Sequence, residues 1–413
     1  MSADDDASRR VAVVLDGFDK WAGGLDFIRL ILNGLLVDPG MQVQLLIPRA
    51  SLRMRLRSLA GALVRLLQGA AKGRLKWLPS PGFEPEAIAA LFADFGTRAA
   101  PHFYVNTRQG LVRAIGTSGA QVVLPSMVAL GRDFPFPWVG YIFDFQHRQL
   151  PEFFRPNERQ QRDAAFSKML TEADVVLANA IAVRNDAESY FPGSARKIVC
   201  LPFAPSPKPE WLALDPAAVQ RAYGLPSRYF IVCNQFWIHK DHATAVRAFA
   251  TFRAEHGGDI ALVCTGGLHD FRAPGHVDGI RALIESLGLG TRVHLLGHIP
   301  KADQIALLRG SIAVLQPTLC EGGPGGGAVY DAVAFGVPAL VSDIPVNREI
   351  SAGNCQFFAP ADAPALAALM RDVAAAPATR PDPAELLAQA RVRLGQLGDA
   401  LRIAIDRAQA RRP

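Results

Sequence analysis

The residues between Leu319 and Ile350 combine an acid, a run of glycines and a helix-like segment. An apolar run over residues 312–315 precedes Glu321, and five glycines and one proline fill the next six positions. Glycine lets a ligand approach the backbone closely, and the first N–H groups of the following helix would form an anion site. An acid beside an anion site predicts a ligand with phosphate and hydroxyl groups, such as a nucleotide sugar. A flexible glycine loop with a solvated glutamate is the alternative.

A second group of polar residues follows the apolar run over residues 229–234. The chain there reads NQFWIHKDH, and Lys240 stands at the entry of a helix-like stretch. A lysine at this place, close to an anion-binding loop, can neutralise a diphosphate. The alternative is a solvated lysine at the start of a helix.

The segment around Glu321 resembles the sugar-binding signature of retaining nucleotide-sugar glycosyltransferases of the GT-B fold, the large family 4 or group 1 type. The run from Asp331 to Pro338, DAVAFGVP, fits the second half of that signature, and SDIP from Ser342 fits its close. The second acid is Asp331 where the family usually has glutamate. It also follows Glu321 by ten positions, whereas the family pattern has eight, which indicates a two-residue loop insertion.

The resemblance extends to both halves of the chain. NQFWIHKDH and, from Asp144, DFQHRQLPEFF are similar to segments of one subgroup of this family. Lys240 matches the family's lysine, whereas Gln235 stands where an arginine is usual. This difference removes one fixed positive charge, and we interpret it as a feature of the subgroup.

The resemblance implies a role for each matched residue. Glu321 would hold the hydroxyls of the donor sugar, and Asp331 would hold those of the ribose. His147 follows an apolar run and could contact the transferred sugar, with Asp144 orienting its imidazole. A histidine hydrogen-bonded near a domain interface and an aspartate that caps a turn are the alternatives.

The remaining assignments concern the phosphates and the base. Lys240 and the N–H groups of the glycine loop would stabilise the leaving diphosphate without a metal or other cofactor. Gly23 and Gly24 would lie opposite the phosphates, and the backbone at His298 and Ile299 would contact the base, although ordinary turns explain these residues equally. The predicted catalytic residues are His147, Lys240 and Glu321. The predicted donor-binding residues are Gly23, Gly24, Gln235, Lys240, His298, Ile299, Glu321, Gly325, Gly326, Gly327, Ala328 and Asp331.

Apolar runs that alternate with helix-like stretches must position these residues. The runs cover residues 11–15, 43–47, 121–124, 139–143, 175–178, 198–201, 229–234, 260–264, 293–296, 312–315 and 339–341. Strands without period-two alternation, separated by helices, indicate parallel sheets covered on both faces. The sequence therefore predicts an α/β protein of two Rossmann-like doubly wound domains that face each other across a cleft.

Prolines mark the expected domain boundary. Four of them stand between Pro202 and Pro209, where they stop both helices and central strands. We expect an acceptor-side domain over residues 1–205 and a nucleotide-sugar-binding domain over 206–390. The last residues, 391–413, are expected to form a helix that packs back on the first domain.

Composition agrees with an enzyme of ordinary globular type. Half of the 413 residues are hydrophobic, which is enough for two cores. The acidic opening MSADDDASRR predicts no signal peptide, and the absence of ~18 consecutive apolar residues predicts no transmembrane helix. The five scattered cysteines are interpreted as reduced thiols of a cytoplasmic protein.

The stretch Ser51–Lys76 alternates arginines with leucines and contains no acidic residue. Such a basic amphipathic helix could lie on an anionic membrane surface and bring the protein to a lipid-linked acceptor at the inner face of the cell membrane. A solvated basic face packed on the sheet is the alternative. The net charge of +6 is also typical of proteins that bind nucleic acid. No recognisable nucleic-acid-binding motif supports that function, and no nucleic-acid partner is expected.

These features lead to one main hypothesis. The chain would transfer a sugar from a GDP- or UDP-sugar, with GDP-mannose among the candidates, to a glycan or lipid-linked acceptor with retention of configuration. Polysaccharide or glycoconjugate biosynthesis is the expected setting. The alternatives are a nucleotide-sugar epimerase and a catalytically degenerate nucleotide-binding subunit; the second is motivated by Gln235 and by the altered spacing of the acids.

Overall fold

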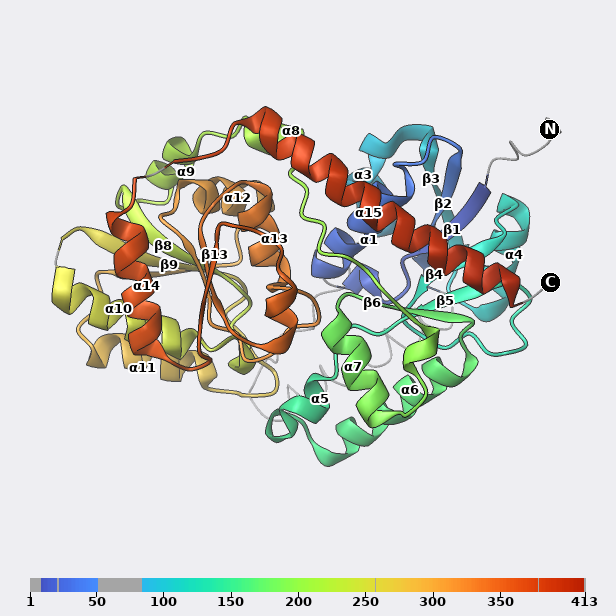
Figure 1. Cartoon of the computed structure of the whole chain (residues 1–413), viewed down its shortest axis with the longest axis horizontal. Helices are drawn as coiled ribbons and strands as arrows, with labels where there is room; N and C mark the ends of the chain where they lie inside the picture. The colour runs from blue at the N-terminus through green and yellow to red at the C-terminus, as the bar shows by residue number, and fades with distance from the viewer. Residues whose placement is uncertain (1–8, 21, 51–83, 257, 378, 412–413) are drawn as a thin grey trace, which may run out of the picture.

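Runs of buried valine, leucine and isoleucine form the strands of two parallel sheets, which lie in two neighbouring α/β domains (Figure 1). The structure is a computed structural model, and it describes residues 9–20, 22–50, 84–256, 258–377 and 379–411. The expected basic helix at residues 51–76 lies outside the described residues.

The first sheet has seven strands in the order β3-β2-β1-β4-β5-β6-β7. All neighbouring strands are parallel, and Val13 of β1 pairs with Leu45 of β2 and Leu124 of β4. The chain order therefore reverses between β1 and β4, where doubly wound sheets open a crevice. The strands are β1 (Arg9–Val14), β2 (Met41–Arg49), β3 (Ala99–Val105), β4 (Val122–Ser126), β5 (Trp138–Tyr141), β6 (Val175–Ala178) and β7 (Ile198–Cys200).

The second sheet has six parallel strands in the order β10-β9-β8-β11-β12-β13 and repeats the same arrangement. Its chain order reverses between β8 and β11. The strands are β8 (Arg228–Cys233), β9 (Ile260–Thr265), β10 (Val293–Gly297), β11 (Val314–Gln316), β12 (Ala339–Ser342) and β13 (Cys355–Phe358).

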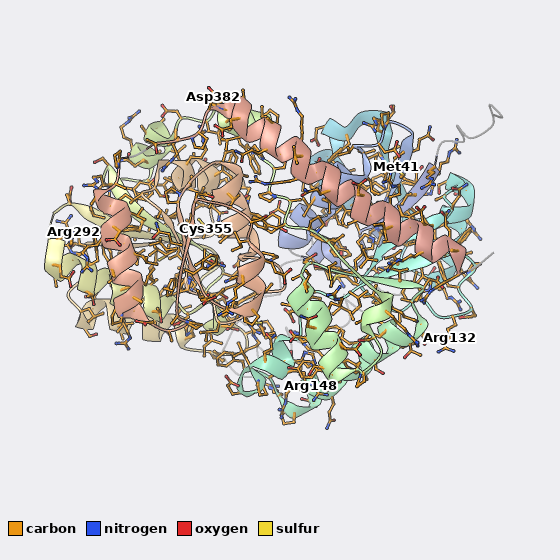
Figure 2. All side chains as sticks on the ribbon, viewed as in Figure 1. Met41, Arg132, Arg148, Arg292, Cys355 and Asp382 are labelled. Carbon is orange, nitrogen blue, oxygen red and sulfur yellow. The ribbon has the colours of Figure 1, made fainter. Side chains whose placement is uncertain are left out.

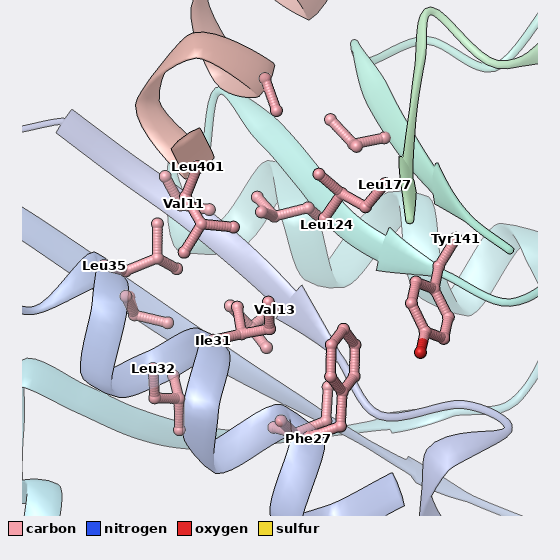
Figure 3. Packing of buried hydrophobic residues seen from close by; sticks show 14 of the residues in the cluster. Val11, Val13, Phe27, Ile31, Leu32, Leu35, Leu124, Tyr141, Leu177 and Leu401 are labelled. Atoms are coloured by element: carbon pink, nitrogen blue, oxygen red, sulfur yellow. The ribbon is translucent and has the colours of Figure 1, made fainter. Parts of the chain in front are cut away.

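Helices cover both faces of each sheet. They are α1 (Ala22–Leu35), α3 (Pro85–Leu91), α4 (Arg108–Ser118), α5 (Gln146–Gln149), α6 (Pro156–Glu172), α7 (Ile181–Tyr190), α8 (Pro209–Leu212), α9 (Pro216–Ala222), α10 (His242–His256), α11 (His276–Ser286), α12 (Lys301–Gly310), α13 (Gly326–Ala334), α14 (Ala363–Ala375) and α15 (Pro383–Ala410). In the first domain α1 and α15 pack on one face, and α4, α6 and α7 pack on the other. Figure 3 shows the first of these cores, with Val11 and Val13 facing Ile31 of α1 and Leu401 of α15.

The last helix, α15, joins the two domains. It begins beside the second domain and runs across the first, where Leu397, Leu401 and Ile405 are buried (Figure 1). Asp382 starts it, since its carboxylate accepts a hydrogen bond from the N–H of Ala384 (2.7 Å) and Pro383 fills the first helical position. This helix fastens the end of the chain to the first domain.

The predicted fold class is confirmed, and every apolar run named above forms or overlaps a strand. Two strands were not predicted, β3 and β13, and both lie at sheet edges. Pro101 interrupts β3, and two of the four residues of β13 are exposed, so neither has the apolar pattern of a central strand. The expected domain boundaries at residues 205 and 390 stay predictions. Among the described residues, no helix is long and apolar enough to span a membrane.

Candidate active site

Lys240 and Glu321 form an ion pair at the carboxyl ends of the two central strands of the second sheet. Lys240 ends a short 3₁₀ helix, η5 (Ile238–Lys240), after β8, and Glu321 follows β11. The lysine Nζ donates to Oε1 of the glutamate, and the side chains are only 11% and 9% exposed. Because β8 and β11 are neighbours, the ends of these strands bring together two of the predicted site residues.

Gln316, the last residue of β11, fixes the glutamate in place. Its fully buried side chain donates from Nε2 to Oε1 of Glu321 and to the carbonyl of Gly325, both at 2.9 Å. Its Oε1 accepts from Nδ2 of Asn234 at 2.6 Å. Gln316 was not among the predicted site residues, although a polar residue at the end of an apolar strand, five positions before Glu321, was an available signal.

The start of α13 lies against the Glu321 carboxylate. Gly325 and Gly326 have φ angles of 68° and 60°, which favour glycine. A Cβ atom on Gly326 would lie 2.8 Å from Oε2 of Glu321, so a side chain there would displace the acid. The N-terminus of α13 carries partial positive charge, which stabilises a nearby anion. The loop therefore combines the acid and the helix start, as predicted, with Gly327 exposed at the surface.

The second acid, Asp331, lies inside α13 and pairs with Lys301, the first residue of α12. Lys301 Nζ is 2.6 Å from Oδ2 of Asp331 and 3.8 Å from Oδ2 of Asp26 in α1. Burial raises the pKa of the Asp331 carboxyl, and the Lys301 ammonium offsets part of that shift. Burial alone would lower the pKa of Lys301, but the two aspartates raise it above its ordinary value. The sequence analysis missed Lys301.

Other predicted donor-binding residues lie at the ends of neighbouring elements. The Gln235 side chain accepts a hydrogen bond from the N–H of Gly267 (2.7 Å), which ties two loops together. His298 is exposed after β10, whereas the Ile299 side chain is buried in the core. Gly23 and Gly24 belong to the first turn of α1, and their predicted place opposite the phosphates stays a prediction.

His147 lies inside the first domain. Its side chain is fully buried against Phe145, Phe154 and Phe166, and its Nε2 is 2.9 Å from Oδ1 of Asp163. Burial lowers the pKa of its imidazole. The structure does not bring this side chain to the Lys240–Glu321 ion pair, and the predicted catalytic role of His147 stays a prediction.

Asp144 caps the turn that leads to His147. Its Oδ1 accepts a hydrogen bond from the N–H of Gln146 at 3.1 Å, which is the second of the two roles considered from the sequence. Burial raises the pKa of this carboxyl. Asp144 lies just after the carboxyl end of β5. This end of the first sheet contacts the glycine loop of the second domain, residues 322–327.

The glycine loop touches the first domain. A Cβ atom on Gly322 would lie 2.3 Å from the carbonyl oxygen of Phe143, and one on Gly323 would lie 3.1 Å from Cβ of Asn179. Phe143 and Asn179 follow β5 and β6, so the loop reaches the strand ends of the opposite sheet. These glycines therefore allow the domains to meet at the ion pair, a role that the sequence analysis did not foresee.

Polar side chains hold the two domains together around this contact. Glu349 of the second domain accepts hydrogen bonds from the N–H groups of Ile181 (2.8 Å) and Ala182 (2.7 Å) at the start of α7. Arg272 donates from Nη1 to Oε1 of Gln146 at 2.8 Å. Within residues 9–411, as far as the structure describes them, no group of three or more His, Cys, Asp or Glu residues could hold a metal ion. Catalysis without a metal stays a prediction.

Two doubly wound domains with their strand ends turned toward a shared contact define the GT-B type of fold. Sucrose-phosphate synthase from Thermosynechococcus elongatus has this fold, with 16% identity, a TM-score of 0.61 and 98% of each chain covered. Anabaena HepE in complex with UDP and glucose matches at 14% identity and a TM-score of 0.60, covering 97% of this chain and 99% of HepE. WaaG, a glycosyltransferase involved in lipopolysaccharide biosynthesis, matches at 14% identity and a TM-score of 0.56, covering 95% of this chain and 98% of WaaG.

Residues 220–390 match the family model described as glycosyl transferases group 1. This match covers the second domain, which contains Lys240, Glu321 and Asp331. Together with the shared fold, it supports the family resemblance. No curated protein sequence matches the chain.

Proposed function

We propose that this protein transfers a sugar from a nucleoside-diphosphate donor to a glycan or lipid-linked acceptor with retention of configuration. The family match and the shared fold support the reaction class. HepE, which has the same fold, was solved with UDP-glucose, and UDP-sugars are therefore one donor class to test. GDP-sugars, including GDP-mannose, are the other.

The Lys240–Glu321 ion pair at the start of α13 carries this proposal. Negative charge grows on the diphosphate as its bond to the sugar breaks. Lys240 has three N–H donors, of which one is used by Glu321, and the remaining ones can bind phosphate oxygens. With the N–H groups around Gly325–Ala328, this lysine would stabilise the leaving group where its charge develops.

Glu321 would orient the donor sugar. Its Oε1 accepts hydrogen bonds from Lys240 and Gln316, while Oε2 faces Gly326, which has no side chain to cover it. A carboxylate held in this way can accept hydrogen bonds from two sugar hydroxyls. Retention would proceed by attack on the face that the diphosphate leaves, without a covalent intermediate on Glu321.

Asp331 would hold the ribose. Its Oδ2 is engaged by Lys301, which fixes its direction and offsets part of the rise in the pKa of this carboxyl that burial causes. Two hydroxyls on adjacent ribose carbons suit an ionised carboxylate as donors. Lys301 also contacts Asp26 of α1, in the other domain. Nucleotide binding at Asp331 would therefore depend on the position of α1.

A nucleotide titration followed by a donor screen tests the proposed function. Isothermal titration with GDP and UDP identifies the base, and GDP- and UDP-sugars are then assayed for hydrolysis and transfer. We expect binding of one nucleotide and slow hydrolysis of its sugar, both weakened by Lys240→Ala. Failure to bind any nucleotide contradicts the proposal.

A catalytically degenerate nucleotide-binding subunit is the second candidate, and Gln235 favours it. This neutral side chain occupies the position of the family's arginine and is already bonded to Gly267. Nucleotide binding without turnover of any donor would support this candidate. Interconversion of a free nucleotide sugar with its epimer would instead support the epimerase alternative.

The acceptor and the place of action are part of the same proposal. A lipid-linked acceptor would require the protein to work in the cytoplasm at the inner face of the membrane, with residues 51–76 as the contact. Binding to anionic vesicles that weakens as salt rises, and that is lost when the arginines at 53, 55 and 57 are replaced, would support this contact. Equal binding to neutral vesicles contradicts it.

A further inference from the structure

The first domain has a pocket lined mostly by basic residues, away from the Lys240–Glu321 ion pair. Its volume is about 350 Å³, and four of its six lining residues are basic: Arg196, Lys197, Arg407 and Arg411. Arg196 and Lys197 belong to a 3₁₀ helix, η4 (Ala195–Lys197), that leads into β7. Arg407 belongs to the last turn of α15, and Arg411 directly follows this helix, so elements far apart in sequence build this basic pocket.

Two of these four residues are fixed by the backbone around them. Lys197 Nζ donates to the carbonyls of Thr171 (3.0 Å) and Ala173 (2.8 Å), at the end of α6. Arg411 donates to the carbonyl of Asp174 at 2.9 Å. Arg196 and Arg407 are exposed at the surface. The pocket thus has two anchored cations and two that can adjust to a ligand.

Positive charge is in excess around the pocket. Burial lowers the pKa of Lys197, and Arg411 and Arg132 lower it further. Figure 2 shows Arg132 on the side of the first domain where α15 ends. Asp174 offsets part of this effect, and its Oδ2 also accepts a hydrogen bond from the N–H of Trp138.

Glu188 is another acid close to these cations; its hydrogen bonds with the backbone lower the pKa of its carboxyl, and Arg196 lowers it further. Its two carboxylate oxygens accept hydrogen bonds from the N–H groups of Gly193 and Ala195, both at 2.8 Å. The excess positive charge is therefore available to a ligand.

The basic pocket is separate from the candidate active site. Strand β6 begins at Val175, which lines the pocket, and ends at Ala178. The next residue, Asn179, contacts Gly323 beside the candidate active site. A strand of this length spans ~13 Å, at about 3.3 Å per residue. The two sites therefore lie at opposite edges of the first sheet, and neither ligand would occupy both.

We propose that this basic pocket binds the phosphate of a phosphomonoester. Arginine guanidinium groups pair with two phosphate oxygens at once, and the lysine supplies a further point charge. A volume of about 350 Å³ lies within the range of small-molecule sites, so the pocket accommodates a phosphate together with the group that it is attached to. Binding would also relieve the repulsion among the four cations.

The test compares two double variants with the unchanged protein, using glucose 6-phosphate as the probe at low ionic strength. Arg196→Ala/Arg407→Ala removes two exposed cations of the pocket and leaves Lys197 and Arg411 in place. Arg113→Ala/Arg391→Ala removes the same charge from two exposed arginines elsewhere. Titration calorimetry should show binding to the unchanged protein, at least tenfold weaker binding to the pocket variant and unchanged binding to the control.

Two further measurements keep this result specific. The melting temperature of the pocket variant should not fall, since the substitutions relieve repulsion and break no hydrogen bond described above. Its affinity for UDP or GDP should match that of the unchanged protein, which separates this pocket from the donor site. Equal probe affinity in the unchanged protein and the pocket variant overturns the proposal, and so does equal weakening in the control.

Vesicles distinguish the two possible sources of the phosphomonoester. Sedimentation with phosphatidylcholine vesicles that contain phosphatidic acid, compared with phosphatidylcholine alone, presents the group on a membrane. Binding that requires Arg196 and Arg407 assigns the pocket to a lipid headgroup. Binding of glucose 6-phosphate with no such vesicle binding assigns it to a soluble phosphate ester. The proposal fails if neither probe depends on these arginines.

Discussion

Lys240 and Glu321 stand 81 positions apart in the chain and form a nearly dry ion pair at the start of α13. Neither charge would be stable there alone, because water reaches little of either side chain. The pair exists because β8 and β11 are neighbours in a parallel sheet, and the loops after them leave the same edge.

A double-mutant cycle on this pair measures their coupling. Lys240→Met leaves the buried Glu321 carboxylate with a hydrogen bond from Gln316 and no positive partner. Glu321→Gln leaves the Lys240 ammonium beside a neutral amide. Each change should destabilise the protein, and the double variant should be more stable than the sum predicts, with a coupling of about 1–3 kcal/mol. Urea unfolding without ligand provides the measurement, and strictly additive effects would contradict it.

The two acids should affect the kinetics differently. Asp331→Asn should raise the Michaelis constant for the donor by roughly 10–100-fold, because a charge-assisted contact to ribose is the same before and at the transition state. Glu321→Gln should mainly lower turnover, because it loosens the sugar where the bond breaks. Initial rates over a range of donor concentrations separate these effects. If both variants behave like the unchanged protein, the acids do not contact the donor.

Lys301→Met provides the control for Asp331. It removes the ammonium 2.6 Å from Oδ2 but leaves the acid in place. We expect the Michaelis constant to rise in the same direction as in Asp331→Asn, and the optimum for donor binding to move to higher pH. The reason is that burial raises the Asp331 pKa and the lysine offsets part of that shift.

Substitution of Gly322 should show whether turnover depends on the contact between the two domains or only on the glycines themselves. Gly322→Ala would place a Cβ atom 2.3 Å from the Phe143 carbonyl, so the domains must move apart. Gly327→Ala is the matched control in the first turn of α13, because the added carbon has no atom within 4 Å outside its neighbours and its own helix and the backbone N–H is kept. Turnover should fall at least tenfold in the first variant and little in the second, with nucleotide affinity retained in both. Equal effects would show that the contact with Phe143 is unimportant.

Asp186 predicts a pH dependence of stability near the same contact. Burial raises the pKa of this carboxyl to about 6, although it accepts a hydrogen bond from Gln149 (2.6 Å), which in turn accepts one from Cys320 of the second domain. The folded protein therefore holds this proton more tightly than the unfolded chain. Stability should fall as pH rises from about 4 to 6 and then level off.

The variant Asp186→Asn isolates this effect because its amide oxygen can still accept from Gln149. Thermal unfolding between pH 4 and pH 8 should show a flatter profile than for the unchanged protein. At pH 7.5 the gain in stability should be on the order of 1–2 kcal/mol after allowance for solvent screening. An unchanged profile would mean that another group causes the slope.

The sequence determined the two parallel sheets and the position of the central acid and lysine. Continuous apolar runs such as residues 229–234 predict buried parallel strands, and parallel strands place the residues after them at one edge. Glu321 and Lys240 could therefore be brought together from the sequence alone. The edge strands were missed because Pro101 and the exposed residues of β13 lack that pattern.

Tertiary structure alone decided which partners the other polar side chains contact. His147 follows a strand as expected, yet the turn at Asp144 directs its ring toward Phe166 and Asp163. Lys301 reaches Asp331 only because α12 packs beside α13. Arg196 and Arg407 come together only because α15 returns to the first domain. Such contacts depend on how helices and strands pack in three dimensions, and the spacing of side chains along the chain does not encode that packing.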